Sequence, residues 1–223
     1  GFHQGMAPVF SGDAEEADNM ELGLRYNKGT TAFEVMYFAS DYANLVGTCT
    51  NSSGGDCEAG QTFSGGEVDV SGLEMTSSMV FEGSNGISYP VAVTFTSTDA
   101  TFENSFNNGD YWGKVAAGDD VPYIPSSVLN ISAGFITEGG LSGYMRLADH
   151  GSSCSTAACG AFQSIDAYSY MDLTLRKAVN PNLDVYGVLE NATDNEDIAA
   201  RAPKDGARSQ KPQTFKVGFS YKF

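Results

Sequence analysis

Basic residues are scarce in this sequence, which has 12 Lys and Arg residues against 28 Asp and Glu residues and a net charge of −16. Binding to nucleic acid through the overall charge is therefore excluded, because contact with phosphates needs a basic surface. Long apolar runs are also lacking, since none approaches the roughly 18 residues that a transmembrane helix requires. This does not exclude a membrane protein, because a barrel strand carries only a weak, alternating hydrophobic signal.

Catalytic and metal-binding motifs are missing as well. The sequence has two His residues and no Gly-x-Ser-x-Gly elbow, metalloprotease helix or phosphate-binding loop, so we predict neither enzymatic activity nor a cofactor. Its acidic clusters could hold Ca²⁺ through carboxylate oxygens, but their spacing fits no defined site. We therefore interpret as solvated loop carboxylates the clusters Asp13 to Asp18, Asp119-Asp120 and Glu196-Asp197.

The four cysteines form two local pairs, Cys49 with Cys57 and Cys154 with Cys159, each in a Ser-, Gly- or Ala-rich segment. We predict that each pair closes a loop as a disulfide, which implies an oxidising compartment. The alternative for the second pair is a zinc site that also uses His150. Zinc sites usually have four ligands with tighter cysteine spacing, so the disulfide is favoured.

The residues from Gln213 to Phe223 alternate strictly between two kinds of side chain. Such a period of two is typical of a strand, whose successive side chains point to opposite faces. About ten residues suffice for a tilted strand to cross the hydrocarbon layer of a membrane. The apolar side of the pattern consists of Phe215, Val217, Phe219, Tyr221 and Phe223, and the other side of Lys216, Gly218, Ser220 and Lys222.

Eight earlier segments show the same alternation, and the connections between them are short and long in turn. An up-and-down membrane barrel has this alternation because its periplasmic turns are short and its extracellular loops long. The sequence therefore predicts an all-β chain in which residues 1–223 form about nine antiparallel barrel strands. Charged residues lie opposite the apolar side of the strands, as a polar lumen requires, namely Arg25, Glu34, Glu74, Arg146, Asp172 and Arg176. A soluble β-sandwich adhesin, with apolar faces packed on each other, is the alternative.

Six short motifs occur in an order that resembles the TonB-dependent outer-membrane receptors. They are Gly1-Phe2 with Pro8, Glu21 to Tyr26, Asp41-Tyr42-Ala43-Asn44-Leu45, Gly72-Leu73-Glu74, Pro122 to Phe135, and Glu190-Asn191-Ala192-Thr193-Asp194. The segment from Gly47 to Cys57 is most similar to the ferric citrate group of these receptors. The terminal Phe219, Tyr221 and Phe223 resemble the signal that the barrel-assembly machinery reads.

The resemblance implies a barrel of about 22 strands around an N-terminal plug, of which this chain would be the C-terminal portion without the plug. It also implies an outer-membrane location in a Gram-negative bacterium, among lipid and lipopolysaccharide. The expected function is capture of an iron chelate by the outer loops, followed by movement of the plug driven by the TonB complex. A passive porin would share the barrel and the terminal Phe, and remains the alternative within membrane proteins.

A basic cluster before the last strand is the main candidate for ligand binding. Arg201, Lys204, Arg208 and Lys211 are a third of all Lys and Arg residues in the chain. An anionic chelate needs such donors, since Arg offers a planar fork to carboxylates. Lipopolysaccharide phosphates or acidic loops are the alternative partners of this cluster. Tyr111 and Trp112 form a second candidate site, although loop aromatics can equally stabilise the loop itself.

Overall fold

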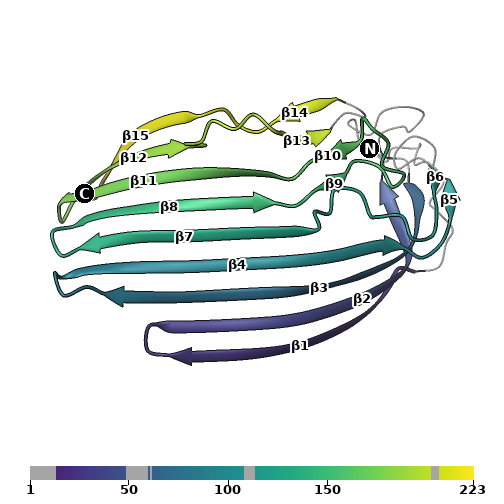
Figure 1. Cartoon of the computed structure of the whole chain (residues 1–223), viewed down its shortest axis with the longest axis horizontal. Helices are drawn as coiled ribbons and strands as arrows, with labels where there is room; N and C mark the ends of the chain where they lie inside the picture. Colours follow the sequence, from purple (N-terminus) through teal and green to yellow (C-terminus); the bar gives the residue numbers. More distant parts are fainter. Residues whose placement is uncertain (1–13, 49–59, 61, 108–113, 202–205) are drawn as a thin grey trace, which may run out of the picture.

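The computed structural model describes residues 14–48, 60, 62–107, 114–201 and 206–223. These residues form one antiparallel sheet of nine strands, each paired with its neighbour in the sequence (Figure 1). The strands are β1 (Glu16–Lys28), β2 (Thr31–Thr48), β3 (Thr62–Glu82), β4 (Ile87–Phe102), β7 (Ser127–Thr137), β8 (Leu141–His150), β11 (Tyr168–Asn180), β12 (Leu183–Glu190) and β15 (Thr214–Tyr221). No helix in this part of the chain is long and apolar enough to cross a membrane.

Short turns join the strands at one end of the sheet, where the C-terminus also lies, and long connections lie at the other end (Figure 1). Three long connections each contain a small hairpin in the described residues. The hairpins are β5 (Phe106–Asn107) with β6 (Lys114–Val115), β9 (Ser153–Cys154) with β10 (Ser164–Ile165), and β13 (Ile198–Arg201) with β14 (Ala207–Ser209). The predicted all-β, up-and-down arrangement of nine strands is therefore confirmed.

Two strands extend further toward the long connections than the sequence predicted. The hydrophobic alternation predicted a strand from Leu73 to Phe81 and another that ends near Thr96, whereas β3 begins at Thr62 and β4 continues to Phe102. The added lengths are rich in Ser, Thr, Gly and Asp. These residues interrupt the hydrophobic alternation, so the few apolar residues among them, such as Val68 and Phe102, did not predict a strand. Backbone pairing nevertheless continues through both lengths, where Val68 lies opposite Phe102.

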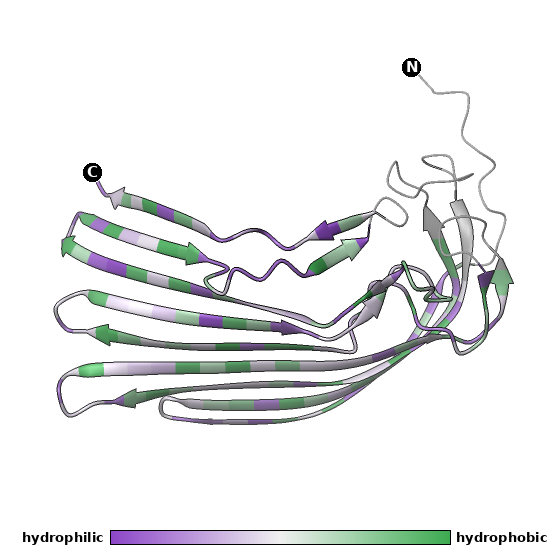
Figure 2. Cartoon of the chain, turned by 45° about the horizontal axis from the view of Figure 1, so that its top comes forward, coloured by the Kyte–Doolittle hydropathy of each residue, from purple (hydrophilic) through white to green (hydrophobic). Residues whose placement is uncertain are grey.

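Hydrophilic and hydrophobic residues alternate along the strands (Figure 2). Because successive side chains of a strand point to opposite faces, the sheet has a polar face and an apolar face. On the polar face Arg25 lies opposite Glu34, and its guanidinium donates two hydrogen bonds to that carboxylate at 2.7 and 2.8 Å. On the apolar face Leu22 and Phe215 are 75% and 71% exposed. The other sheets of the described residues have two strands each, so this part of the chain has no second large sheet to cover the apolar face, as the sandwich alternative requires. An apolar face that meets lipid instead is typical of a membrane barrel.

Close packing is confined to the end with the long connections. Val68, Phe102, Val115 and Ala157 are buried together there, and Phe102 is 1% exposed. The ring of Phe106 packs edge-on against that of Phe102, with centroids 5.4 Å apart. The loops therefore fold onto the polar side of β3 and β4, and the site described below lies at the same end of the sheet.

Aromatic rings cover glycines of neighbouring strands on the polar face. A Cβ atom at Gly72 would lie 2.5 Å from the ring of Phe38 and would also collide with the carbonyl oxygen of Ser97. Gly134 lies in the same way under Tyr144, where a Cβ atom would come within 2.6 Å of the ring. Packing an aromatic ring over a cross-strand glycine holds the register of a curved sheet.

We expect the Gly72→Ala substitution to reduce the stability of the barrel by about 1–3 kcal/mol, because the added methyl group has no space. The measurement is the unfolding temperature of the whole protein, followed by the loss of heat-modifiable migration in electrophoresis. Gly187→Ala is the matched control, since its nearest neighbouring atom would lie 3.8 Å away, on Phe215. Equal unfolding temperatures for the two variants would contradict this packing.

Candidate functional site

A cavity of about 290 Å³ lies on the polar face near the long connections. Strands β11 and β12 provide one side of it, and the residues around the β13–β14 hairpin provide the other. Its lining combines phenol rings, carboxylates, amides and an ammonium group, from Tyr168, Tyr170, Asp172, Glu190, Asn191, Ala199, Gln210 and Lys211. This composition suits a polar ligand with aromatic or charged groups.

The aromatic part of the site is a stack that crosses from β8 to β11. Tyr168 lies directly opposite His150 in the register. Their rings are nearly parallel, with centroids 4.7 Å apart, and the ring of Tyr170 lies 6.2 Å from that of His150. Both tyrosines fall on the polar face because they are two residues apart on one strand. The stack gives the cavity a flat wall with hydroxyl groups at its edge.

The charged part of the site is centred on Glu190, the last residue of β12. Its carboxylate accepts hydrogen bonds from the ammonium groups of Lys211 and of Lys216, the latter at 2.6 Å. Two positive charges thus share one negative charge. The carboxylate is 24% exposed and the two lysine side chains are half exposed. The lysines therefore remain accessible to an anion that enters from the loop side.

Asn191 holds the start of the last long connection against the sheet. Its side-chain amide donates to the carbonyl oxygens of Asn195 and Lys211, both at 2.9 Å, and its backbone N–H donates to the Asp172 carboxylate at 2.9 Å. Asn191 is 3% exposed and has a φ of 46°, a conformation that Asn tolerates better than most residues. This network places Lys211 beside Glu190.

Comparison with known proteins identifies the family to which this chain belongs. The model of the family described as TonB dependent receptor-like, beta-barrel, matches residues 1–192. The chain belongs to the TonB-dependent receptor β-barrel family. This membership agrees with the predictions that the chain is a barrel wall and not an enzyme, because members of the family are receptors and transporters. No curated protein sequence matches this chain.

Solved structures of receptors share the fold at low sequence identity. The ferric-catecholate import receptor Fiu of E. coli K12, in its closed form, is 20% identical with a TM-score of 0.68, over 98% of this chain and 30% of Fiu. The siderophore receptor PiuA of Acinetobacter baumannii is 14% identical with a TM-score of 0.72, over 94% and 29%. The copper transporter OprC is 13% identical with a TM-score of 0.66, over 94% and 31%. This chain thus spans about 30% of the length of these proteins.

The predicted basic cluster is divided among different environments. The Arg201 side chain is half buried and donates through Nε to the carbonyl oxygen of Ser164 at 2.6 Å, while its own carbonyl accepts from the Tyr123 hydroxyl. Arg201 therefore connects three long connections to one another. Arg208 is exposed on β14, and Lys211 pairs with Glu190. Lys204 lies outside the described residues, as do Tyr111 and Trp112.

One of the two predicted disulfides falls within the described residues, and the structure confirms it. Cys154 and Cys159 are bonded, with Cα atoms 5.4 Å apart, whereas Cys49 and Cys57 lie outside the described residues. The zinc alternative is wrong, because both sulfur atoms that it requires are bonded to each other. The backbone N–H of Tyr123 donates to the carbonyl oxygen of Cys154 at 2.7 Å, so the disulfide loop supports the neighbouring connection.

Carboxylates outside the cavity have mainly local roles. Asp119 accepts a hydrogen bond from the backbone of Ala116, and Asp197 accepts one from Gln210. Three exposed carboxylates have oxygens within 4.8 Å of one another, namely Asp41, Asp69 and Glu103. The linear sequence did not reveal this group, because each of its members lies on a different segment.

The terminal aromatics Phe219, Tyr221 and Phe223 are exposed and lie on the apolar side of the final alternation. Their role in barrel assembly remains a prediction.

The sequence alone did not predict the stack of aromatic rings or the two ion pairs that Glu190 forms with Lys211 and Lys216. The spacing of Tyr168, Tyr170 and Asp172 is two residues, so the alternation alone would have put all three on the polar face. His150 and Lys216 join them only through pairing between strands, which depends on register. An aromatic residue on the polar face of a strand, next to a long connection, is the signal that could have indicated this part of the cavity.

We expect Asn191→Asp to loosen the last long connection, because a carboxylate cannot donate to the two carbonyl groups that the amide now satisfies. A buried polar group without a partner costs about 1–3 kcal/mol, so hydrogen exchange in residues 192–213 should accelerate by about five- to 150-fold. Asn180→Asp is the matched control, since the Asn180 side chain only accepts a bond, from the N–H of Asn182. Unchanged exchange in the Asn191 variant would contradict the role of this network.

Proposed function

We propose that this chain is the C-terminal part of the barrel of a Gram-negative outer-membrane receptor that captures an anionic iron chelate and transports it with energy from TonB. The polar-face cavity is the observation that carries the proposal. Its phenol groups and the shared lysines Lys211 and Lys216 lie near the loop end, where a chelate from outside would arrive. The shared fold with receptors for ferric-catecholate and siderophore import supports iron as the cargo.

The cargo in this proposal is a ferric citrate or siderophore-type chelate. Such chelates expose carboxylate or phenolate oxygens, which ammonium and guanidinium groups bind through charge-assisted hydrogen bonds. The similarity of residues 47–57 to the ferric citrate group favours citrate within this class. The shared fold with a copper transporter makes free copper or a copper complex the control cargo in any test.

The remaining partners follow from the proposed location. The apolar face would meet outer-membrane lipid and lipopolysaccharide, and the terminal aromatics Phe219, Tyr221 and Phe223 would be read by the barrel-assembly machinery. The polar face would surround a plug domain through which TonB acts. Membership of the TonB-dependent receptor family favours this energised mechanism over a passive porin.

The test is uptake of labelled chelate by cells that carry the whole receptor as their only route for it, with and without functional TonB. We expect ferric citrate or a ferric siderophore to bind in both strains and to enter only where TonB works. Uptake that persists without TonB would support the porin alternative. Absence of binding to any ferric chelate, together with binding of copper, would overturn the proposed cargo.

We expect Arg208→Gln to weaken chelate binding severalfold at low salt. The Arg208 side chain is exposed on β14, so its attraction for an anion is screened beyond about 8 Å at physiological salt. The loss should therefore appear as slower association and should shrink as salt concentration rises. Lys28→Gln, at the short-turn end of β1, is the matched control. Equal affinities for the Arg208 variant and the unmodified receptor at low salt would remove Arg208 from the binding surface.

A further inference from the structure

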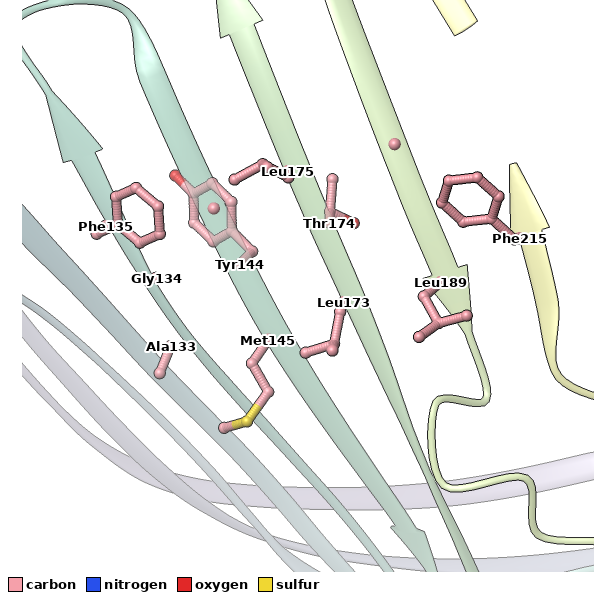
Figure 3. Close-up of a pocket in the computed structure, with 12 residues that line it drawn as sticks. Ala133, Gly134, Phe135, Tyr144, Met145, Leu173, Thr174, Leu175, Leu189 and Phe215 are labelled. Atoms are coloured by element: carbon pink, nitrogen blue, oxygen red, sulfur yellow. The ribbon is translucent and has the colours of Figure 1, made fainter. Parts of the chain in front are cut away.

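A shallow apolar depression of about 550 Å³ lies on the opposite side of the sheet, across β7, β8, β11, β12 and β15 (Figure 3). Two glycines interrupt the row of large side chains there, since Leu175 pairs with Gly143 on one side and with Gly187 on the other. Bulky residues of the apolar face surround them. The main apolar side chains of the lining are Phe135, Met145, Leu173, Leu175, Leu189 and Phe215.

The two glycines are not equivalent. A Cβ atom at Gly143 would lie 2.5 Å from the ring of Phe135, so that ring already occupies the space above Gly143. At Gly187 the nearest atoms would be 3.8 Å away on Phe215 and 3.9 Å away on the backbone of Lys216. The depression is therefore open above Gly187, between Leu175 and Phe215, which are 54% and 71% exposed.

A cation lies just below the depression, at the short-turn end of the sheet. Lys177 is two residues from Leu175, so both side chains are on the apolar face. Its ammonium group donates to the carbonyl oxygen of Gly139 in the β7–β8 turn at 2.5 Å, which leaves two of its three N–H donors. None of the ion pairs in the described residues includes Lys177. The carboxylate of that turn, Glu138, lies beside Gly86 of the β3–β4 turn instead.

The distance from Lys177 to Leu173 fits within one leaflet of a membrane. The two residues are four positions apart, or about 13 Å along a strand, and a tilted strand of that length spans less than the roughly 15 Å of half a hydrocarbon core. A lipid whose phosphate binds Lys177 at the rim would therefore extend an acyl chain past Leu175 to Leu173. The short turns of a bacterial barrel face the periplasm, so this leaflet is the periplasmic one.

We propose that the depression is a binding site for one phospholipid of the periplasmic leaflet, with an acyl chain over Gly187 and the phosphate at Lys177. The inference rests on the outer-membrane location in the proposed function. The apolar lining, together with the Lys177 ammonium group, which has no ion-pair partner among the described residues, fits a lipid with one phosphate and extended chains. A second copy of the chain would instead require a larger apolar contact and a partner charge for Lys177.

The experiment measures how many lipid molecules the whole receptor retains after transfer from vesicles of phosphatidylethanolamine and phosphatidylglycerol into detergent, by native mass spectrometry. We expect Gly187→Leu, which fills the depression, to retain one phospholipid fewer than the unmodified receptor. Lys177→Gln should lower occupancy of the same lipid severalfold. The matched controls are Ser77→Leu, on the same face but paired with Phe33 and Val93 away from the depression, and Lys28→Gln. Both should retain the full number.

Equal retention by Gly187→Leu and Ser77→Leu would overturn the site, as would displacement of the retained phospholipid by added lipopolysaccharide. Heat-modifiable migration checks that each variant is folded, and Lys177→Gln tests the site independently if Gly187→Leu fails to assemble. Ferric chelate binding by Gly187→Leu should match that of the unmodified receptor. Failure of the lipid site alone would leave chelate binding intact, whereas failure of the proposed function would abolish chelate binding in the unmodified receptor too.

Discussion

The continuous antiparallel backbone ladder from β1 to β15 determines where every functional group of this chain lies. Because successive side chains point to opposite faces, a single register places the polar residues of nine strands on one face of the sheet and the apolar residues on the other. The Arg25–Glu34 pair near one edge of the sheet and the Lys216–Glu190 pair near the other therefore lie on the same face. A slip of one residue in the register of a strand would exchange its two faces. Aromatic rings that pack over glycines of the neighbouring strand oppose such a slip.

The loop end of the molecule is ordered by different forces. Its small buried cluster around Phe102 is supplemented by hydrogen bonds from side chains to backbone, through Asn191, Arg201 and Tyr123. Such bonds hold a connection in place without an extensive hydrophobic core, and the bonds of the buried Asn191 also satisfy polar groups that would otherwise lack a partner. They also leave charged and phenolic groups at the surface of the cavity, where a ligand can reach them.

Hydrophobic alternation was sufficient to predict the nine strands, their direction and the two faces, because these depend on local pattern. It was insufficient where Ser, Thr, Gly and Asp interrupt the pattern, as in the extensions of β3 and β4, and in the short strands of the three loop hairpins. The basic cluster shows the same limit for a site. Charge density in the sequence grouped Arg201 with Arg208, but Arg201 is used to join loops and Arg208 is exposed. The Tyr168–His150 stack depends on pairing between strands, which no single segment encodes.

The central claim is that one face of this sheet lines a water-accessible interior while the other meets lipid. Single cysteines at successive positions of β12, from Val185 to Leu189, would test it in the whole receptor in its native membrane, with a water-soluble thiol reagent and a lipid-soluble quencher. The structure predicts that labels at positions 185, 187 and 189 are quenched from the lipid, and that cysteines at 186 and 188 react with the water-soluble reagent. Uniform reactivity along β12, or the opposite alternation, would contradict the account.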